Sequence, residues 1–391
     1  MILGQKKSSL TLDTAMASTG TALISDLLEP SKGSSPIATN SLLAAMLKVN
    51  PQVSDLIFSP GRLPQIEVHG QLISVEGKGL HPLIADDTRR IASDLIGNNK
   101  QAIQILREQG SCDISYGLAG VARFRVNVFI QRGSCAVVMR VIPTTIPELG
   151  SLGLPNSLAE IATIRDGIVL VTGPRGCGKS STLAAILDLI NRHRVCHIIT
   201  IENPIEFLHN HKRATVHQRE LHSDTPSMPM ALRAALRQSP DVILVSEASD
   251  REMVEMMLDA AESGHLVFSS LNTVDAHKTW EKITGMFSAS EQETVRGRLA
   301  RSLRSIISQR LIPRRDGSGS VPALEVVKVR PSMLSEWDNC SSTDPHKTSS
   351  VAGLDAEIEK LVRANVIDPE TALSHAIDPD RLCQALTANC K

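Results

Sequence analysis

The sequence contains the stretch Gly173-Pro174-Arg175-Gly176-Cys177-Gly178-Lys179-Ser180, which has the form G-x-x-x-x-G-K-S/T of a phosphate-binding loop. Glycines let such a loop fold tightly and turn its backbone N–H groups toward a phosphate. The lysine supplies positive charge for the β- and γ-phosphates, and the serine hydroxyl is a ligand for Mg²⁺. We therefore expect ATP contacts from Gly173, Pro174, Arg175, Gly176, Cys177, Gly178, Lys179, Ser180 and Ser181.

The segments on either side of the loop fit this interpretation. The apolar run 167–172 predicts a buried strand, and residues 181–190 predict a helix. The N-terminus of that helix, with its dipole, would face the phosphates. Cys177 is expected to be a tolerated small residue of the loop and not a nucleophile.

The composition limits the class of protein. A length of 391 residues suggests two or three domains, and 42% hydrophobic residues suffice for buried cores. The net charge of −1 gives no attraction to nucleic acid, so we expect no nucleic-acid partner. The sequence has no apolar run near 18 residues and no C-x-x-C pair among its seven cysteines. We therefore expect a reduced, cytoplasmic α/β protein without a transmembrane helix.

Changes in composition predict the domain organisation. Residues 1–38 are rich in Ser, Thr, Gly and Ala and predict a disordered extension, whereas 39–145 mix strands with helices. Residues 146–332 alternate strand and helix, which favours a largely parallel sheet. Residues 333–350 predict a loop, and 351–391 predict a helical region.

Local signals place several elements within these domains. Residues 65–73 predict a hairpin that turns at Gly70, and residues 85–106 predict helical structure. Proline commonly begins helices, so Pro369 and Pro379 predict two helix starts.

Three predicted strands after the loop end in polar side chains. They end near Glu202, at Glu247 and at Thr273. Ligands of open α/β sheets bind beyond the carboxyl ends of strands, so these groups should converge on the phosphate loop. We expect Glu247 to orient the attacking water and, with Ser180, to hold Mg²⁺, partly through water.

Further motifs follow one another in order along the chain. They are segments 113–116 and 120–129, Thr200 to Phe207, Ala234 to Glu247, Ala260 to Phe268, and Ser308 to Gly317. Segments 113–116 and 120–129 together resemble the arginine strand of the secretion-type hexameric ATPases. The next three motifs resemble, in order, their aspartate box, Walker B region and histidine box. Within these ATPases, the sequence is similar to the type IV pilus retraction (twitching motility) ATPases PilT and PilU, and its last motif leans toward the PilU branch.

The resemblance implies a fold, an activity and an assembly. It implies a smaller PAS-like α+β domain, then a RecA-like P-loop NTPase domain, then C-terminal helices. It implies a homo-hexameric ATPase that drives pilus retraction from the cytoplasm, peripheral to the inner membrane. Its implied partners are the inner-membrane platform protein of a type IV pilus and a paralogous retraction ATPase.

The resemblance also implies further catalytic residues. These are Glu202, His265, Arg123, Arg125 and Arg140, in addition to Glu247. Arg123 and Arg125 are two residues apart on a predicted strand, so they share one face. The three arginines would complete the ATP site of a neighbouring subunit.

The sequence departs from the family pattern at several places, including three residues near the predicted site. Asn203 replaces an aspartate, Ser246 replaces a glycine, and Asn272 replaces a histidine. An alternative function is therefore a catalytically impaired, PilU-like ring subunit that binds ATP and assists an active paralogue. A pilus-assembly or secretion ATPase is a weaker alternative, because the four-cysteine zinc cluster common in those relatives is missing from this sequence.

Overall fold

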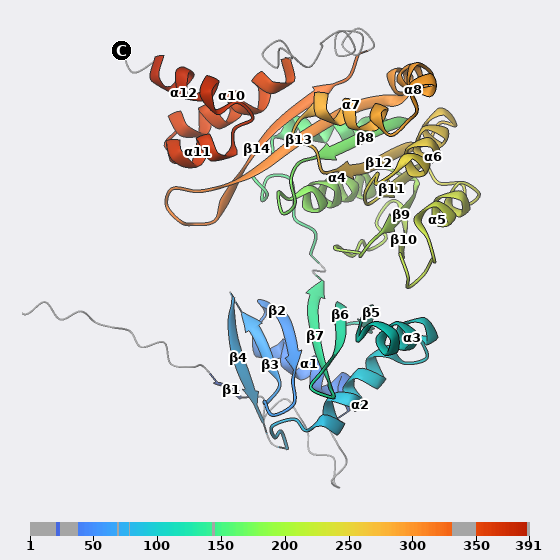
Figure 1. Cartoon of the computed structure of the whole chain (residues 1–391), viewed down its shortest axis with the longest axis vertical. Coiled ribbons are helices and arrows are strands. Elements are labelled where there is room, and N and C mark those ends of the chain that lie inside the picture. The colour runs from blue at the N-terminus through green and yellow to red at the C-terminus, as the bar shows by residue number, and fades with distance from the viewer. Residues whose placement is uncertain are drawn as a thin grey trace, which may run out of the picture. The chain divides into compact units, whose positions relative to one another are not determined.

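The computed structural model of the chain describes residues 21–23, 38–68, 70–77, 79–142, 145–330 and 349–388. It consists of two compact units, which divide between Val141 and Ile142 (Figure 1).

The first unit is a seven-stranded, mainly antiparallel sheet with three helices. Its strand order is β1-β4-β3-β2-β7-β6-β5. Buried side chains of the helices and strands, including Leu43, Ile91 and Phe124, form one core. The elements are β1 (Thr21–Leu23), α1 (Thr39–Val49), β2 (Val53–Phe58), β3 (Gln65–Val68), β4 (Gln71–Glu76), α2 (Ala85–Ile96), α3 (Lys100–Gln109), β5 (Ser111–Leu118), β6 (Ala122–Gln131) and β7 (Ser134–Ile142).

Two local expectations for this unit differ from the structure. The helical structure predicted over 85–106 is interrupted, because Gly97 ends α2 with φ 55° and its amide donates to the Ser93 carbonyl. Asn99 then caps α3 by accepting from the amide of Ala102 at 3.0 Å. The short strand β1 lies within the range for which disorder was predicted, and it pairs with β4.

The second unit contains a seven-stranded sheet in the order β10-β9-β11-β12-β8-β13-β14. Its pairs are parallel except for the hairpin of β13 and β14. The elements are the short 3₁₀ helix η1 (Asn156–Thr163), β8 (Gly167–Thr172), α4 (Lys179–His193), β9 (His197–Glu202), β10 (Thr215–Glu220), α5 (Met228–Ala235), β11 (Val242–Val245), α6 (Arg251–Glu262), β12 (Leu266–Leu271), α7 (Ala276–Gly285), α8 (Ala289–Ser302), β13 (Leu303–Pro313) and β14 (Ser320–Lys328).

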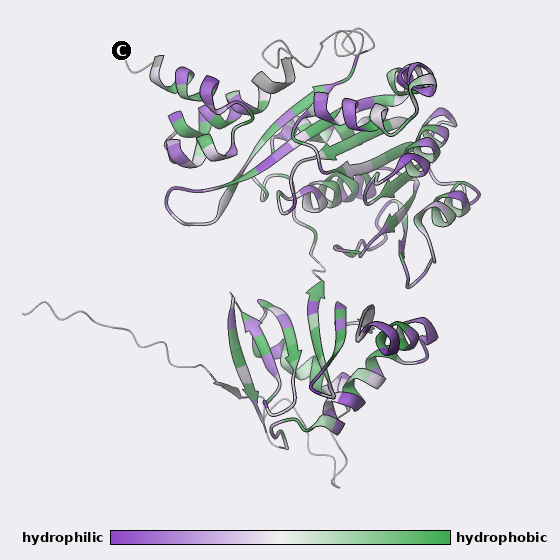
Figure 2. Ribbon diagram, viewed as in Figure 1, coloured by the Kyte–Doolittle hydropathy of each residue, from purple (hydrophilic) through white to green (hydrophobic). Residues whose placement is uncertain are grey.

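Helices cover both faces of this sheet. Buried residues of α4 pack with one face, and those of α5 to α8 pack with the other. All six residues of β8 are buried, and Figure 2 shows hydrophobic strands beside helices of mixed polarity. This RecA-like arrangement and the α+β unit before it confirm the predicted fold class.

Three C-terminal helices pack against the β13–β14 hairpin of the same unit. They are α10 (Ser349–Arg363), α11 (Pro369–His375) and α12 (Pro379–Ala388), so two of them begin at the predicted prolines. Their buried residues share a core with Ile312, Val321 and Ala323. Of the predicted loop 333–350, residues 333–348 lie outside the described residues. Within the described ranges, no helix is long and apolar enough to cross a membrane.

Candidate nucleotide-binding site

The predicted phosphate loop connects β8 to α4 and begins in close contact with β13. Gly173 has φ 149°, and a Cβ added there would lie 2.4 Å from the carbonyl oxygen of Gln309 and 2.5 Å from Sγ of Cys177. Gly178 has φ 90° at the N-cap of α4. Only glycine fits both the backbone conformation and the space at these two positions.

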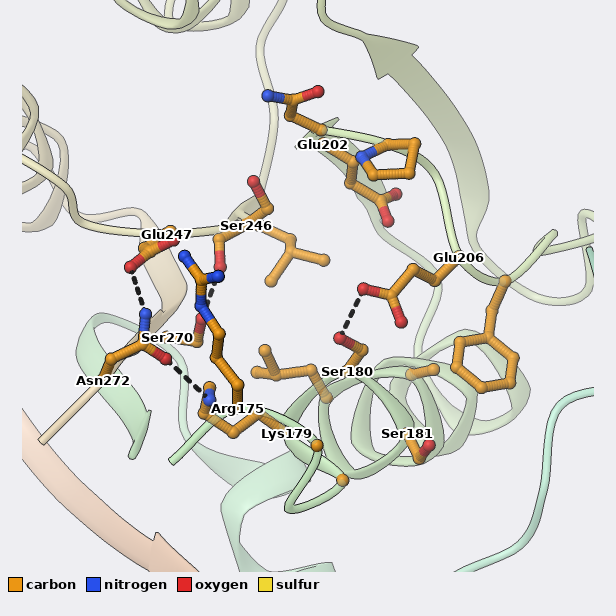
Figure 3. Close-up of a pocket in the computed structure, with 18 of the residues that line it drawn as sticks. Arg175, Lys179, Ser180, Ser181, Glu202, Glu206, Ser246, Glu247, Ser270 and Asn272 are labelled. Carbon is orange, nitrogen blue, oxygen red and sulfur yellow. Dashed lines mark hydrogen bonds between the residues drawn. The ribbon is translucent and has the colours of Figure 1, made fainter. Parts of the chain in front are cut away.

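The loop borders a cavity of about 390 Å³ (Figure 3). The predicted strand-end residues Glu202 and Glu247 line it as well, so the structure brings these strands together at the loop. The loop and α4 contribute Arg175, Gly176, Gly178, Lys179, Ser180, Ser181, Leu183 and Ala184 to this lining. The other strands and their loops contribute Glu202, Asn203, Pro204, Glu206, Phe207, His209, Leu244, Ser246, Glu247, Ser270 and Asn272.

Lys179 uses all three of its ammonium donors within the site. Its Nζ donates to the carbonyl oxygens of Gly173 at 2.9 Å and Pro174 at 2.8 Å, and to Oδ1 of Asn272 at 2.9 Å. Burial lowers the pKa of this lysine, and the charge of Glu247 opposes that effect. The ammonium group is therefore held in place by neutral acceptors that a phosphate can replace.

Asn272 connects the phosphate loop to the predicted catalytic carboxylate. While its Oδ1 accepts from Lys179, its Nδ2 donates to Oε1 of Glu247 at 2.7 Å (Figure 3). The sequence predicts Asn272 at a strand end near the site, as a departure from histidine, but not as a catalytic or binding residue. Its position directly after β12 was the available signal, because a strand-end residue faces the loop.

Ser180 pairs with a carboxylate that was missing from the predicted site. Its Oγ donates to Oε1 of Glu206 at 2.8 Å. The sequence signal was the second carboxylate four residues after Glu202. A serine hydroxyl beside carboxylates, with Glu247 lining the same cavity, is an oxygen-rich donor set that fits Mg²⁺ held largely through water.

Glu202 lies at the end of β9 and is almost fully buried. Its Oε1 accepts from Oγ1 of Thr200 at 2.6 Å and from Nε2 of Gln218 at 3.0 Å. Burial raises the pKa of Glu202 to about 7, although these hydrogen bonds favour the ionised form. The carboxyl group can therefore either hold or release a proton near neutral pH.

Cys177 points into the packing between the loop and β13. It is buried, and that burial raises the pKa of its thiol. The thiol is thus kept neutral, which agrees with the expected tolerated small residue and not with a nucleophile.

His265 does not lie at the site that its predicted catalytic role requires. It precedes β12, and its Nδ1 lies 2.9 Å from the Ala260 carbonyl. The six-residue strand then spans roughly 20 Å before it reaches the phosphate loop. The prediction identified the right strand, but the polar group at the correct end is Asn272.

Arg123, Arg125 and Arg140 belong to the first unit. Arg123 and Arg125 alternate on β6 with buried Phe124 and Val126, so they share one sheet face, as predicted. Arg140 follows buried Met139 on the neighbouring strand β7, and its Nε donates to Asp55 at 3.0 Å. The three guanidinium groups thus lie on the sheet face opposite the core.

Comparisons with known proteins place the chain among its relatives. Residues 84–366 match the family model of type II/IV secretion system proteins. The chain is 40% identical to the type IV pilus retraction ATPase PilT of Pseudomonas aeruginosa, over 84% of this chain and 95% of that protein. It is 34% identical to the type IV pilus ATPase PilU of the same organism, over 84% of this chain and 87% of that protein.

A solved structure gives the same result. The crystal structure of the pilus retraction motor PilT with bound ADP matches with a TM-score of 0.77 and 37% identity, over 88% of this chain and 98% of that one. The resemblance found in the sequence is confirmed, although PilT is more similar than PilU, contrary to the leaning of Ser308 to Gly317. The chain belongs to the family of type II/IV secretion system proteins.

Proposed function

We propose that this chain is an ATPase that powers the retraction of a type IV pilus. The observation that carries the proposal is the bridge from Lys179 through Asn272 to Glu247 at the mouth of the phosphate loop. It joins a phosphate-binding group to a carboxylate in a chain that is 40% identical to a PilT retraction ATPase.

The residues divide the work of hydrolysis. The loop amides and Lys179 hold the β- and γ-phosphates. Ser180 and the carboxylate of Glu206 would hold Mg²⁺, which neutralises charge on the phosphates when bound. Glu247 orients the attacking water, and Asn272 fixes the position of its carboxylate. Glu202, with a pKa of about 7, is suited to accept or return a proton nearby.

The proposed assembly is a homo-hexamer on the cytoplasmic side of the inner membrane. In it, Arg123, Arg125 and Arg140 would face the ATP bound by a neighbouring subunit and offset the charge of its γ-phosphate. The proposed partners are the platform protein of the pilus and a paralogous retraction ATPase. The similarity to PilT and PilU supports a place in pilus machinery.

A second candidate function is an impaired ring subunit that binds ATP and assists an active paralogue. The neutral amides Asn203 and Asn272 favour it, because both line the cavity where the resemblance implies groups that are charged or can become charged. Such groups are often worth a few kcal/mol in the transition state.

The decisive experiment compares nucleotide binding and phosphate release by the full-length wild type with those of two variants. Lys179→Ala should lose Mg-ATP binding, whereas Glu247→Gln should bind normally and turn over roughly 100-fold or more slowly. Lys282→Ala is the control, because Lys282 is an exposed lysine on α7 of the same unit.

Each outcome separates the candidates. A wild type that binds ATP and turns it over, with loss in both variants, supports the motor. If ATP binding by the wild type depends on Lys179, but its basal turnover is the same as that of Glu247→Gln, the result supports the impaired subunit. Binding that is unaffected by Lys179→Ala contradicts both.

A further inference from the structure

Gln309 of β13 supports the phosphate loop from within the core. Its Nε2 donates to the Cys177 carbonyl at 2.6 Å, and its Oε1 accepts from Oγ1 of Thr182 at 2.7 Å. The side chain is buried, so water cannot substitute for these bonds. The position of the loop is therefore tied to the position of β13.

The next residue, Arg310, points to the other face of β13. Side chains alternate along a strand, and that face is the one covered by the C-terminal helices, since Ile312 shares their core. Arg310 is 7% exposed. One guanidinium nitrogen donates to the Gln309 carbonyl at 3.2 Å, and the other donates to the Val274 carbonyl at 3.0 Å.

These two hydrogen bonds span the strand that leads into the loop. In the sheet, β8 lies between β12 and β13. Val274 follows β12 by three residues, and the same segment carries Asn272. Arg310 therefore joins the segments on both sides of β8. Gly173, at the start of the loop, donates its amide to the Leu271 carbonyl at 3.2 Å between them.

The surroundings keep Arg310 in this position. Burial lowers its pKa, and the carboxylates of Asp275 and Asp355 oppose that effect. Asp355 belongs to α10 and accepts from the amides of Ile377 and Asp378, so the C-terminal helices are ordered around the same charges. A planar guanidinium can donate in two divergent directions, whereas a lysine ammonium on a flexible stem acts as a single point charge.

We propose that Arg310 is a positioning residue for ATP hydrolysis. From the face covered by the C-terminal helices, it fixes the spacing between β13, which supports the phosphate loop, and the segment after β12, which places Asn272 against Glu247. Arg310 lies outside the cavity lining. Its loss should therefore affect the alignment for catalysis more than the affinity for nucleotide. The inference rests on the proposed ATPase function.

The test measures single-turnover ATP hydrolysis and Mg-ATP binding by full-length Arg310→Lys. This variant keeps the positive charge but loses the planar guanidinium that donates in two directions. A displacement of about 1 Å at a reacting group can cost up to about 100-fold, so we expect the rate to fall by about 10-fold or more. The nucleotide dissociation constant should change less than about threefold, since all loop contacts remain. Arg310→Met, which removes the charge as well, is measured in the same assays. If Arg310→Met does not fold, the result for Arg310→Lys alone tests the proposal.

Arg298→Lys is the matched control. Arg298 donates to Glu262 and Asp259 of α6 and is half-buried, but it lies outside the site. The proposal is supported if Arg310→Lys hydrolyses ATP more slowly than the wild type, Arg298→Lys hydrolyses it at the wild-type rate, and the two variants have similar melting temperatures. Equal rates in wild type and Arg310→Lys overturn it, as does an equal loss in both variants. If the wild type itself neither binds nor hydrolyses ATP, the proposed function has failed instead.

Discussion

The bridge formed by Asn272 makes a direct prediction for Asn272→Ala. The change removes one hydrogen bond from Lys179 and one to Glu247, at 2.9 and 2.7 Å. Lys179 retains its two loop carbonyls, at 2.9 and 2.8 Å, and the loop keeps its amides. In the variant, the carboxylate of Glu247 should therefore no longer be held in position, whereas phosphate binding should be retained.

The size of the effect follows from the two bonds. A hydrogen bond to a charged group contributes about 1.5 to 3 kcal/mol. Asn272 is exposed, so water replaces part of this and the lower figure applies. About 1.5 kcal/mol in the transition state corresponds to roughly a 10-fold loss in kcat. The affinity for nucleotide should change less than about threefold, because Lys179 keeps its two loop carbonyls and the loop keeps its amides.

The assay is steady-state phosphate release by matched oligomeric preparations, together with nucleotide titration. Gln104→Ala serves as the control, since Gln104 also donates an amide N–H to a carboxylate, that of Glu108, on an exposed helix of the first unit. An unchanged or raised kcat in Asn272→Ala would refute the positioning role. A loss of binding with normal kcat would show that Asn272 acts on affinity instead.

Three further predictions concern charge. Asn203→Asp combined with Asn272→His should raise the steady-state rate, and no gain over a brisk wild type would contradict impaired catalysis. Burial raises the pKa of Glu325, on β14, to about 8 from 4.5. As the pH rises, this carboxyl group loses its proton at a lower pH in the unfolded chain than in the folded one. The free energy of unfolding should therefore fall between pH 5 and 8. Glu325→Gln should flatten this slope, by up to about 1.4 kcal/mol per pH unit in denaturant titrations, and an unchanged slope would contradict the assignment. Mixing Arg125→Ala with Lys179→Ala subunits should restore some ATPase activity if the arginines act on a neighbour, and confirmed mixed rings without rescue would exclude this.

Short-range patterns accounted for much of the fold. The glycines and Lys179 predicted the loop, because each is required by a backbone conformation or a charge at that point. The apolar runs before and after it predicted strands whose ends converge. The break at Gly97 was missed, because the apolar spacing continues across it while the local backbone does not.

Long-range contacts at the site could not be predicted in the same way. Gln309 lies more than 120 residues beyond the loop that it supports, and nothing in an apolar strand identifies which polar residue faces a given neighbour. His265 was assigned to the site from a motif, whereas the sheet shows that the carboxyl end of β12, and not its start, faces the phosphates.

The layout of the site separates binding from hydrolysis, and this bears on how the two proposed functions differ. The residues predicted to hold phosphates are contiguous in sequence, from Gly173 to Ser181. The groups proposed to act on the attacking water follow β9, β11 and β12, and Asn203, Ser246 and Asn272, which depart from the family pattern, also follow these strands. Those departures can therefore alter turnover while leaving ATP binding intact, so the ratio of kcat to binding affinity, and not binding alone, distinguishes a motor from an impaired ring subunit.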